Sequence, residues 1–207
     1  MAKRPACTVC RRPLSVCLCS AITTMKAWVS GTQVNDGAQV TGDQLKLVIW
    51  QDPTEAKHPL STAPLLNLSI QDSVLLQGDH FSYQQVFGDT PVDQVAVLYP
   101  FNSGNAVTAE HRHAVRALLI IDGTWRKTRK LVLQNPWLAE LPFIALQPEE
   151  KSRYRIRTSP HDFGLSTIEA GAMALNWLAD TDEFSRILSV LDRLVEIQQS
   201  FGHKADK

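Results

Sequence analysis

The 207-residue sequence lacks a long hydrophobic run, and no apolar stretch approaches the roughly 20 residues that a transmembrane helix needs. The first residues, MAKRPACTVC, also lack the apolar core of a secretory signal peptide, so we expect a cytoplasmic protein without membrane contact. Neither sign of charge is in excess, because 21 Lys and Arg residues balance 21 Asp and Glu residues. Overall charge therefore gives no indication of a nucleic-acid partner, and nothing in the composition indicates an obligate protein partner.

Several signatures of nucleotide and hydrolase chemistry are also missing. There is no G-x-G, which excludes the dinucleotide-binding turn, and there is neither a Walker loop nor a G-x-S-x-G elbow. Five or six short apolar runs nevertheless alternate with helix-like segments, which is typical of an α/β domain with a mainly parallel sheet and helices on both faces. We expect buried strands at 45–50, 73–77, 94–98, 117–121 and 143–146, and helices at 61–68, 125–134, 166–178 and 183–198.

Cysteine is absent after residue 19, and the four that precede it follow a C-x2-C-x6-C-x-C spacing. They are Cys7, Cys10, Cys17 and Cys19. Disulfides are not expected in a cytoplasmic protein, whereas four thiolates in one short loop suit tetrahedral zinc. Such zinc would be structural, because four protein ligands leave no open coordination position. A redox pair or free thiols are the alternative.

The chain divides into three parts by composition. Residues 1–20 form the predicted zinc knuckle, and residues 45–207 contain all the expected strands and helices. Between them, residues 21–44 are rich in Gly, Thr, Gln and Asn, which predicts an irregular connection or a loose hairpin.

The most informative stretch is a predicted strand, turn and helix. The apolar run Ala117 to Ile121 is long enough for a strand that is buried on both faces. It ends at Asp122 and at Gly123, which can adopt a positive φ, and the helix from Trp125 stops before Pro136. In open α/β sheets, ligands bind at such turns, outside the carboxyl ends of the strands.

This turn also has a purely structural explanation. Asp122 and Thr124 have side chains that cap helices, and Trp125 is a residue type that often packs in a core. Ser166 and Glu169 likewise fit an S-x-x-E capping box, which explains both residues without any function.

The order of several motifs resembles that of the DTW-domain family. Asp122-Gly123-Thr124-Trp125 is similar to its D-x-T-W signature, and four further stretches match in the same order. These are the four-cysteine knuckle, Asp-Pro-Thr-Glu at 52–55, Leu-Tyr-Pro at 98–100 and LSTIEA at 165–170. Many members carry His-Pro-x-Glu at the second stretch, so Glu55 is the clearer match and His58 is expected on the surface. The resemblance covers nearly the whole chain except residues 21–44.

The resemblance implies a SPOUT-like fold, with its C-terminal half threaded into a trefoil knot. It implies that S-adenosylmethionine binds bent among the loops of the knot and that the knuckle holds zinc. The reaction implied is transfer of the 3-amino-3-carboxypropyl group to N3 of a tRNA uridine, with release of methylthioadenosine. The residues implied for donor binding are Leu98, Tyr99, Pro100, Asp122, Gly123, Thr124, Trp125, Leu165, Ser166, Thr167 and Glu169. Those implied for catalysis are Asp122, as base or proton relay, Thr124 and Trp125.

Two clusters of basic residues are candidates for RNA contact. The first consists of Arg126, Lys127 and Lys130, and the second of Arg153, Arg155 and Arg157. In the second cluster, alternation along a strand would place the arginines on one side and Tyr154 on the other. Such a face can contact RNA phosphates, with Trp125 or Tyr154 stacking on a base, or it can simply be solvated.

Two other functions remain open at this point. A SPOUT-like RNA methyltransferase would share the donor and the fold, but it would release S-adenosylhomocysteine instead of methylthioadenosine. A non-catalytic, zinc-containing RNA-binding protein would not bind S-adenosylmethionine at all.

Overall fold

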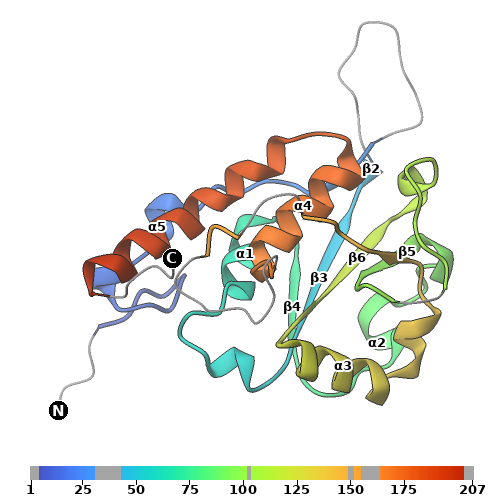
Figure 1. Ribbon diagram of the computed structural model, residues 1–207, viewed down its shortest axis with the longest axis horizontal. Coiled ribbons are helices and arrows are strands. Elements are labelled where there is room, and N and C mark those ends of the chain that lie inside the picture. Colours follow the sequence, from blue (N-terminus) through green and yellow to red (C-terminus); the bar gives the residue numbers. More distant parts are fainter. Residues whose placement is uncertain (1–4, 31–42, 102–103, 149–151, 155–163, 203–207) are drawn as a thin grey trace, which may run out of the picture.

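The structure is a computed structural model, and it describes residues 5–30, 43–101, 104–148, 152–154 and 164–202. At its centre lies a five-stranded sheet in which every pairing is parallel, with the order β4-β3-β6-β5-β7 (Figure 1). The strands are β3 Lys46–Gln51, β4 Val74–Gln77, β5 Val95–Leu98, β6 Ala117–Asp122 and β7 Phe143–Ile144. The predicted α/β class with a parallel sheet is therefore confirmed.

The apolar runs become the strands that the sheet buries on both faces. β3 and β6 lie side by side in the middle, and their alternate residues enter two separate cores. The prediction that residues 73–77 form a buried strand is wrong in one respect. β4 lies at the edge of the sheet, so Val74 is exposed and Leu75 and Leu76 are only partly buried.

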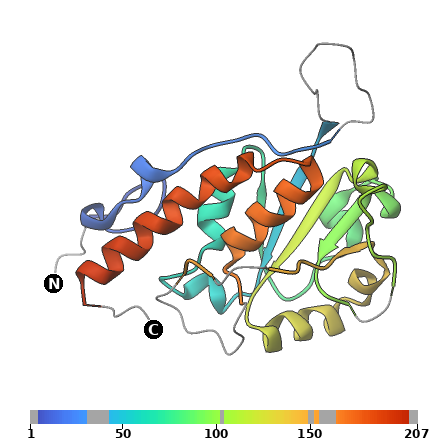
Figure 2. The same cartoon turned by 45° about the horizontal axis from the view of Figure 1, so that its top comes forward.

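Helices cover both faces, as the sequence predicts (Figure 2). α1 (Ala63–Ser69) and α4 (Thr167–Ala179) pack on one face, and α5 (Ser189–Ser200) extends this layer. α2 (Tyr83–Phe87) and α3 (Trp125–Gln134) pack on the other face. The short 3-10 helices are Leu14–Val16, Cys19–Ala21, Glu55–Lys57, Val92–Gln94, Arg112–Ala114, Pro136–Glu140 and Glu183–Leu188.

The last predicted helix, 183–198, is divided in the structure. Its first part is the 3-10 helix Glu183–Leu188, which buries Phe184 and Ile187, and α5 begins only at Ser189. The ring of Phe184 packs against Trp28, with the ring centroids 6.2 Å apart. The apolar spacing is compatible with either helix type, so it did not reveal the change in winding.

The segment before the sheet is tied to the core at both of its described ends. β1 (Trp28–Val29) and β2 (Asp43–Gln44) pair antiparallel, in line with the hairpin alternative for residues 21–44, whose middle, 31–42, lies outside the described residues. Val29 is fully buried, and the next backbone N–H, that of Ser30, donates to the carbonyl of Leu178 at the end of α4. Within the described part of the chain, no helix combines the length and apolar character needed to cross a membrane.

We predict that Gly171 permits the close approach of α4 to α1. A Cβ at this position would lie 2.6 Å from Leu66 Cδ2 and 3.4 Å from Ile120 Cδ1, and Leu66 is fully buried. Gly171→Val should therefore lower the free energy of unfolding by about 1–3 kcal/mol through overpacking, measured by urea denaturation. The control is Ala170→Val, one residue earlier and only partly buried. Equal losses in both variants would contradict the packing argument.

Candidate active site

Polar side chains are buried at the carboxyl ends of the two central strands. Gln51 ends β3 and Asp122 ends β6, and the two are direct partners in the parallel register. Asp122 is 6% exposed and Gln51 is fully buried, while Asp52 and Glu55 are buried in the loop that follows β3. Burying a carboxylate is costly unless it is paired or hydrogen-bonded, so each of these groups depends on its partners.

The carboxylate of Asp122 joins three elements. Its Oδ2 accepts a hydrogen bond from Gln51 Nε2 at 2.7 Å, and its Oδ1 accepts one from Thr167 Oγ1 at the start of α4. Gln51 Nε2 also donates to Ser61 Oγ at 2.8 Å, and Gln51 Oε1 accepts from Gln77 Nε2 at 3.1 Å. One network therefore connects β4, β3, β6 and the N-terminus of α4.

The structural explanation of the D-x-T-W turn is wrong in two respects. Thr124 occupies the N-cap position of α3, but its side chain accepts no capping hydrogen bond. Trp125 is 51% exposed instead of packing in the core, and its ring lies against Tyr99 with the centroids 6.2 Å apart. An open aromatic surface therefore borders the carboxylate network.

Gly123 serves a close approach and not a positive φ. Unlike Gly88, Gly104 and Gly202, it does not adopt a positive φ. A Cβ at Gly123 would lie 3.3 Å from Lys127 Cβ and 3.6 Å from Asp52 Cβ. The tight contact is thus the one with Lys127 in the first turn of α3, whereas Asp52 in the loop after β3 would lie at an ordinary contact distance.

The loop after β3 is held by its own acidic groups. Asp52 Oδ1 accepts hydrogen bonds from the backbone N–H of Thr54 at 2.8 Å and of Glu55 at 3.3 Å, and from the Thr54 hydroxyl. Lys127 Nζ lies 2.8 Å from Glu55 Oε1 and 4.0 Å from Asp52 Oδ1. Burial alone would raise the pKa of Asp52, but these hydrogen bonds and the charge of Lys127 outweigh burial and hold the pKa below its ordinary value of 3.8.

The three stretches implied for donor binding meet at this edge of the sheet. Leu98, which ends β5, pairs in register with Ile120 of β6, and Tyr99 and the exposed Pro100 follow it. The N-terminus of α4 brings Leu165, Ser166 and Thr167 to the same edge through the bond between Thr167 and Asp122.

The capping box at the start of α4 is confirmed. Ser166 and Glu169 exchange the two expected hydrogen bonds. The buried carboxylate of Glu169 also accepts from Ser152 Oγ at 2.7 Å and from the backbone N–H of Arg153 at 2.6 Å. Glu169 thereby anchors the segment that precedes residues 155–163, which lie outside the described residues.

The basic residues predicted for RNA contact have different surroundings. Arg126 and Lys130 are exposed on α3, as is Arg129 beside them, and Lys130 Nζ lies 3.9 Å from Asp79 Oδ1. Lys127 is directed instead to the acidic loop, where it pairs with Glu55. Arg153 is exposed and lies 3.7 Å from Asp192, and Arg155 and Arg157 fall outside the described residues. Tyr154 is buried, and its hydroxyl donates to the carbonyl of Leu60.

The four cysteines form a compact group whose Sγ atoms all lie within 4.8 Å of one another. The distances are 3.6 Å from Cys7 to Cys19 and 3.7 Å from Cys10 to Cys17. Four thiolates about 2.3 Å from a tetrahedral zinc ion would be about 3.8 Å apart, so the spacing fits zinc. Backbone N–H groups of Cys10 and Val9 lower the pKa of Cys7 to about 6, whereas burial and the neighbouring thiols raise that of Cys19 to about 12. A bound cation would favour the ionisation of all four thiols together.

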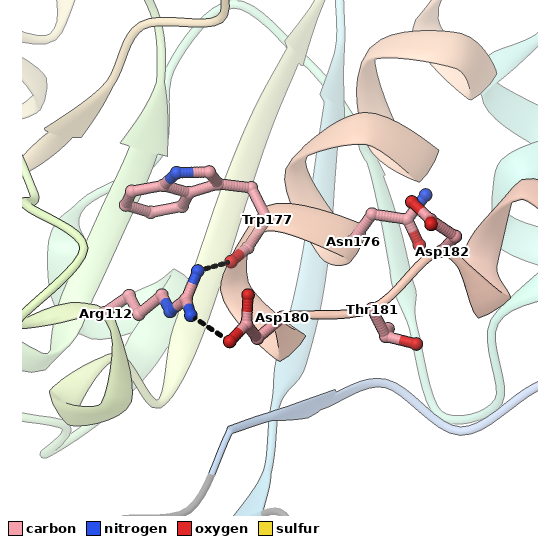
Figure 3. A pocket seen from close by; sticks show the side chains of 6 residues that line it. All are labelled: Arg112, Asn176, Trp177, Asp180, Thr181 and Asp182. Carbon is pink, nitrogen blue, oxygen red and sulfur yellow. Dashed lines mark hydrogen bonds and ion pairs between the residues drawn. The ribbon is translucent and has the colours of Figure 1, made fainter.

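A separate hollow of about 300 Å³ lies at the other end of β6 (Figure 3). It is lined by Arg112, Asn176, Trp177, Asp180, Thr181 and Asp182. Arg112 forms an ion pair with Asp180 at 2.6 Å and donates to the carbonyl of Trp177 at 2.9 Å. These groups fasten the end of α4 to the segment before β6, and none belongs to the D-x-T-W turn.

Comparison with known proteins decides the family. The model of the DTW domain matches residues 4–199 of the chain. This chain belongs to the DTW domain family. The predicted resemblance is thus confirmed, and the D-x-T-W signature is the turn in which Asp122 is buried and Trp125 exposed. No solved structure matches the chain.

Named relatives of this DTW protein come from animals and a plant. It is 31% identical over 198 residues to tRNA-uridine aminocarboxypropyltransferase 2 of Drosophila melanogaster, covering 90% of this chain and 71% of that protein. It is 27% identical over 216 residues to the Macaca fascicularis protein of the same name, covering 97% and 65%. It is 22% identical over 232 residues to tRNA-uridine aminocarboxypropyltransferase A of Arabidopsis thaliana, covering 96% and 83%. The chain thus spans just under two thirds of the macaque protein.

No sequence motif points to several members of the network. Gln51 and Gln77 end their strands, and Ser61 precedes α1, so their side chains meet only when the sheet forms. The one usable signal was a polar residue directly after the apolar run of β3.

The depressed pKa of Asp52 predicts a pH-dependent contribution to stability. The contribution is present above about pH 4 and is lost as the pH falls through the folded-state pKa. Asp52→Asn should lower the free energy of unfolding at pH 7 by about 2 kcal/mol and by less at pH 3, measured in urea. Asp72→Asn is the control, because Asp72 is exposed and its positive φ of 59° also suits Asn. An equal loss at both pH values would show that the charge of Asp52 is not the cause.

The cysteine geometry predicts about one zinc ion per chain in protein purified without chelator. Elemental analysis should find it, and Cys17→Ser should lower the zinc content and the midpoint of thermal unfolding. The fall in stability is expected because Leu18, the next residue, is fully buried in the main core. We expect binding of S-adenosylmethionine to be affected less than the folding of the N-terminus. Metal-free protein with four titratable thiols would rule the zinc site out.

Proposed function

We propose that this protein transfers the 3-amino-3-carboxypropyl group of S-adenosylmethionine to N3 of a uridine in tRNA and releases methylthioadenosine. Membership of the DTW family and the names of its relatives support this proposal. The observation that carries it is the buried carboxylate of Asp122. It belongs to the DTW signature and is held by Gln51 and Thr167 at the edge where the family's motifs converge.

The donor would lie along the carboxyl ends of β5 and β6. In our proposal the backbone of Leu98 to Pro100, the turn from Asp122 to Trp125, and Leu165 to Glu169 surround it. The exposed ring of Trp125, which lies against Tyr99, offers a face on which adenine or uracil can stack. A sulfonium has three electrophilic carbons, and the bound pose decides which of them faces the nucleophile.

The acceptor needs help because N3 of uracil carries a proton. Asp122 would receive this proton, after which N3 forms a bond to the terminal carbon of the aminocarboxypropyl group. The bond from that carbon to sulfur breaks, and its electron pair remains on sulfur to give neutral methylthioadenosine. Thr124, exposed on the turn, and Trp125 would orient the uracil. A uridine in an unpaired loop is the natural target, since its base can be splayed out at low cost.

The exposed face of α3 is the proposed contact surface for tRNA. Arg126, Arg129 and Lys130 are exposed there, directly beyond Trp125. We assign Arg153, Arg155 and Arg157 to the same role on the family resemblance. Lys127 is better explained as a partner of Glu55, since its ammonium group already lies 2.8 Å from that carboxylate.

Two structural parts of the proposal follow the family as well. We assign a SPOUT-like knotted fold, with which the parallel sheet and the return of β6 between β3 and β5 are compatible. We also assign a structural zinc ion to the four cysteines, whose spacing fits that metal.

The first test is the product formed from S-adenosylmethionine when it is incubated with the protein and tRNA. Chromatography should detect methylthioadenosine. S-Adenosylhomocysteine in its place would make the protein a methyltransferase. Absence of both, together with no binding of S-adenosylmethionine, would favour a non-catalytic RNA-binding protein.

The second test is Asp122→Asn, which keeps the shape of the side chain but removes the oxygen that accepts the proton. Transfer in a single turnover should fall by about 10²–10⁴-fold, as is typical for loss of a general base. Thermal stability and affinity for S-adenosylmethionine should change little by comparison. Asp72→Asn, a change of the same kind at an exposed position, should transfer normally. A folded Asp122→Asn protein with a near wild-type rate would remove Asp122 from the chemistry.

A further inference from the structure

We propose that the hydroxyl of Thr167 carries the proton from the substrate to Asp122, and that Gln51 is the positioning residue that holds the carboxylate for this transfer. The inference rests on the proposed function and assigns individual steps within that site. It uses three features of the network: the difference in exposure between Asp122 and Thr167, the fixed orientation of the Gln51 amide, and the position of Thr167 on α4.

The first feature is access. Asp122 is only 6% exposed, whereas Thr167 is partly exposed at the N-terminus of α4. Thr167 is therefore the more exposed of the two residues, and its hydroxyl lies at the hydrogen-bonded edge of the carboxylate. Thr167 Oγ1 donates its hydrogen to Asp122 Oδ1, which leaves the lone pairs of the hydroxyl oxygen able to accept another hydrogen bond.

The second feature is the orientation of the Gln51 amide. Gln77 Nε2 donates to Gln51 Oε1 at 3.1 Å, and this donor shows which end of the Gln51 amide carries the oxygen. The two hydrogens of Gln51 Nε2 then point to Ser61 Oγ and to Asp122 Oδ2, at 2.8 Å and 2.7 Å. Reversing the amide would place its oxygen against the carboxylate of Asp122. Both oxygens are acceptors, so they would repel each other.

Among the described residues, Asp122 accepts an N–H hydrogen bond from Gln51 on one oxygen and an O–H hydrogen bond from Thr167 on the other. An ionised carboxylate accepts at both oxygens in this way, and the O–H partner is the one that can pass a proton on. Gln51 is fully buried and cannot touch a substrate, so it acts only by fixing the position and orientation of Asp122.

The third feature is that the hydroxyl of Thr167 is not needed to begin the helix. Thr167 is the first residue of α4, and the N-cap bonds are made by Ser166 and Glu169. The hydroxyl is therefore free of the usual structural task of a Thr at a helix start, and its hydrogen is used on Asp122 instead.

The proposed relay moves two protons. The N3–H bond of uracil breaks as its proton moves to Thr167 Oγ1, while the proton of Thr167 moves to Asp122 Oδ1. The N3 electron pair forms the bond to carbon, and the carbon–sulfur pair stays on sulfur. Thr167 ends with one proton, as it began, and Asp122 returns its proton to solvent after the product leaves.

The test compares two substitutions of Thr167 in the full-length protein, with single-turnover release of methylthioadenosine as the readout. Thr167→Ser keeps the hydroxyl and should transfer within about threefold of the wild-type rate. Thr167→Val keeps the shape but removes the hydroxyl, and should transfer about 10²-fold more slowly. The matched control is Thr90→Val. Thr90 follows α2, and the substitution removes a hydroxyl that donates to the carbonyl of Phe87.

A pH profile separates the relay from a structural role. Without the relay, deprotonation of uracil depends on hydroxide, so the Thr167→Val rate should rise about tenfold per pH unit while the wild-type rate changes less. The double variant Asp122→Asn, Thr167→Val should be no more than about twofold slower than the slower single variant, because both changes break one relay. The proposal would be overturned if the rate losses of the two single variants multiply in the double variant. A pH profile of Thr167→Val parallel to that of wild type would also overturn it.

Gln51 is tested in the same assay. Gln51→Glu places a second carboxylate beside Asp122, so the pH at which the rate reaches half its maximum should rise. An unchanged pH profile would remove Gln51 from the relay. If wild-type protein releases no methylthioadenosine, the proposed function itself fails. If wild type transfers and Thr167→Val transfers equally well with normal affinity for S-adenosylmethionine, only the relay fails.

Discussion

The carboxylate of Asp122 lies at the end of a strand that is buried on both faces, and this burial constrains everything around it. A charge in that position must be hydrogen-bonded, and the parallel register of β3 places Gln51 directly opposite it. Gln51 in turn depends on Gln77 of the edge strand, and the second carboxylate oxygen depends on Thr167. The site is therefore assembled by the sheet and by α4 together.

The neighbouring acidic loop follows the same physical rule. Asp52 and Glu55 are buried, and they are satisfied by backbone N–H groups and by Lys127 from the first turns of α3. Gly123, which has no side chain, leaves room for the Cβ of Lys127 at the start of α3. The ion pair of Lys127 with Glu55 thus joins α3 to the acidic loop, while Arg126 and Arg129 of the same helix are exposed.

Local patterns in the sequence predicted much of this architecture. The bounds of α3, the capping box of α4 and the clustering of the cysteines follow from spacing within about a dozen residues, and the structure agrees with each. Gln51 and Thr167, which hydrogen-bond to Asp122, lie 71 and 45 residues away from it, so no local pattern could reveal these contacts. The edge position of β4 and the pairing of Lys127 with Glu55 were missed for the same reason, since both depend on how distant segments come together.

The proposed transfer to tRNA is tested most directly on the RNA itself. Unmodified tRNA is incubated with the wild-type protein and S-adenosylmethionine, digested to nucleosides and analysed by mass spectrometry. We predict a uridine that carries the 3-amino-3-carboxypropyl group, at one position in an unpaired loop. A methylated nucleoside, or tRNA that remains unchanged although S-adenosylmethionine is bound, would contradict the account.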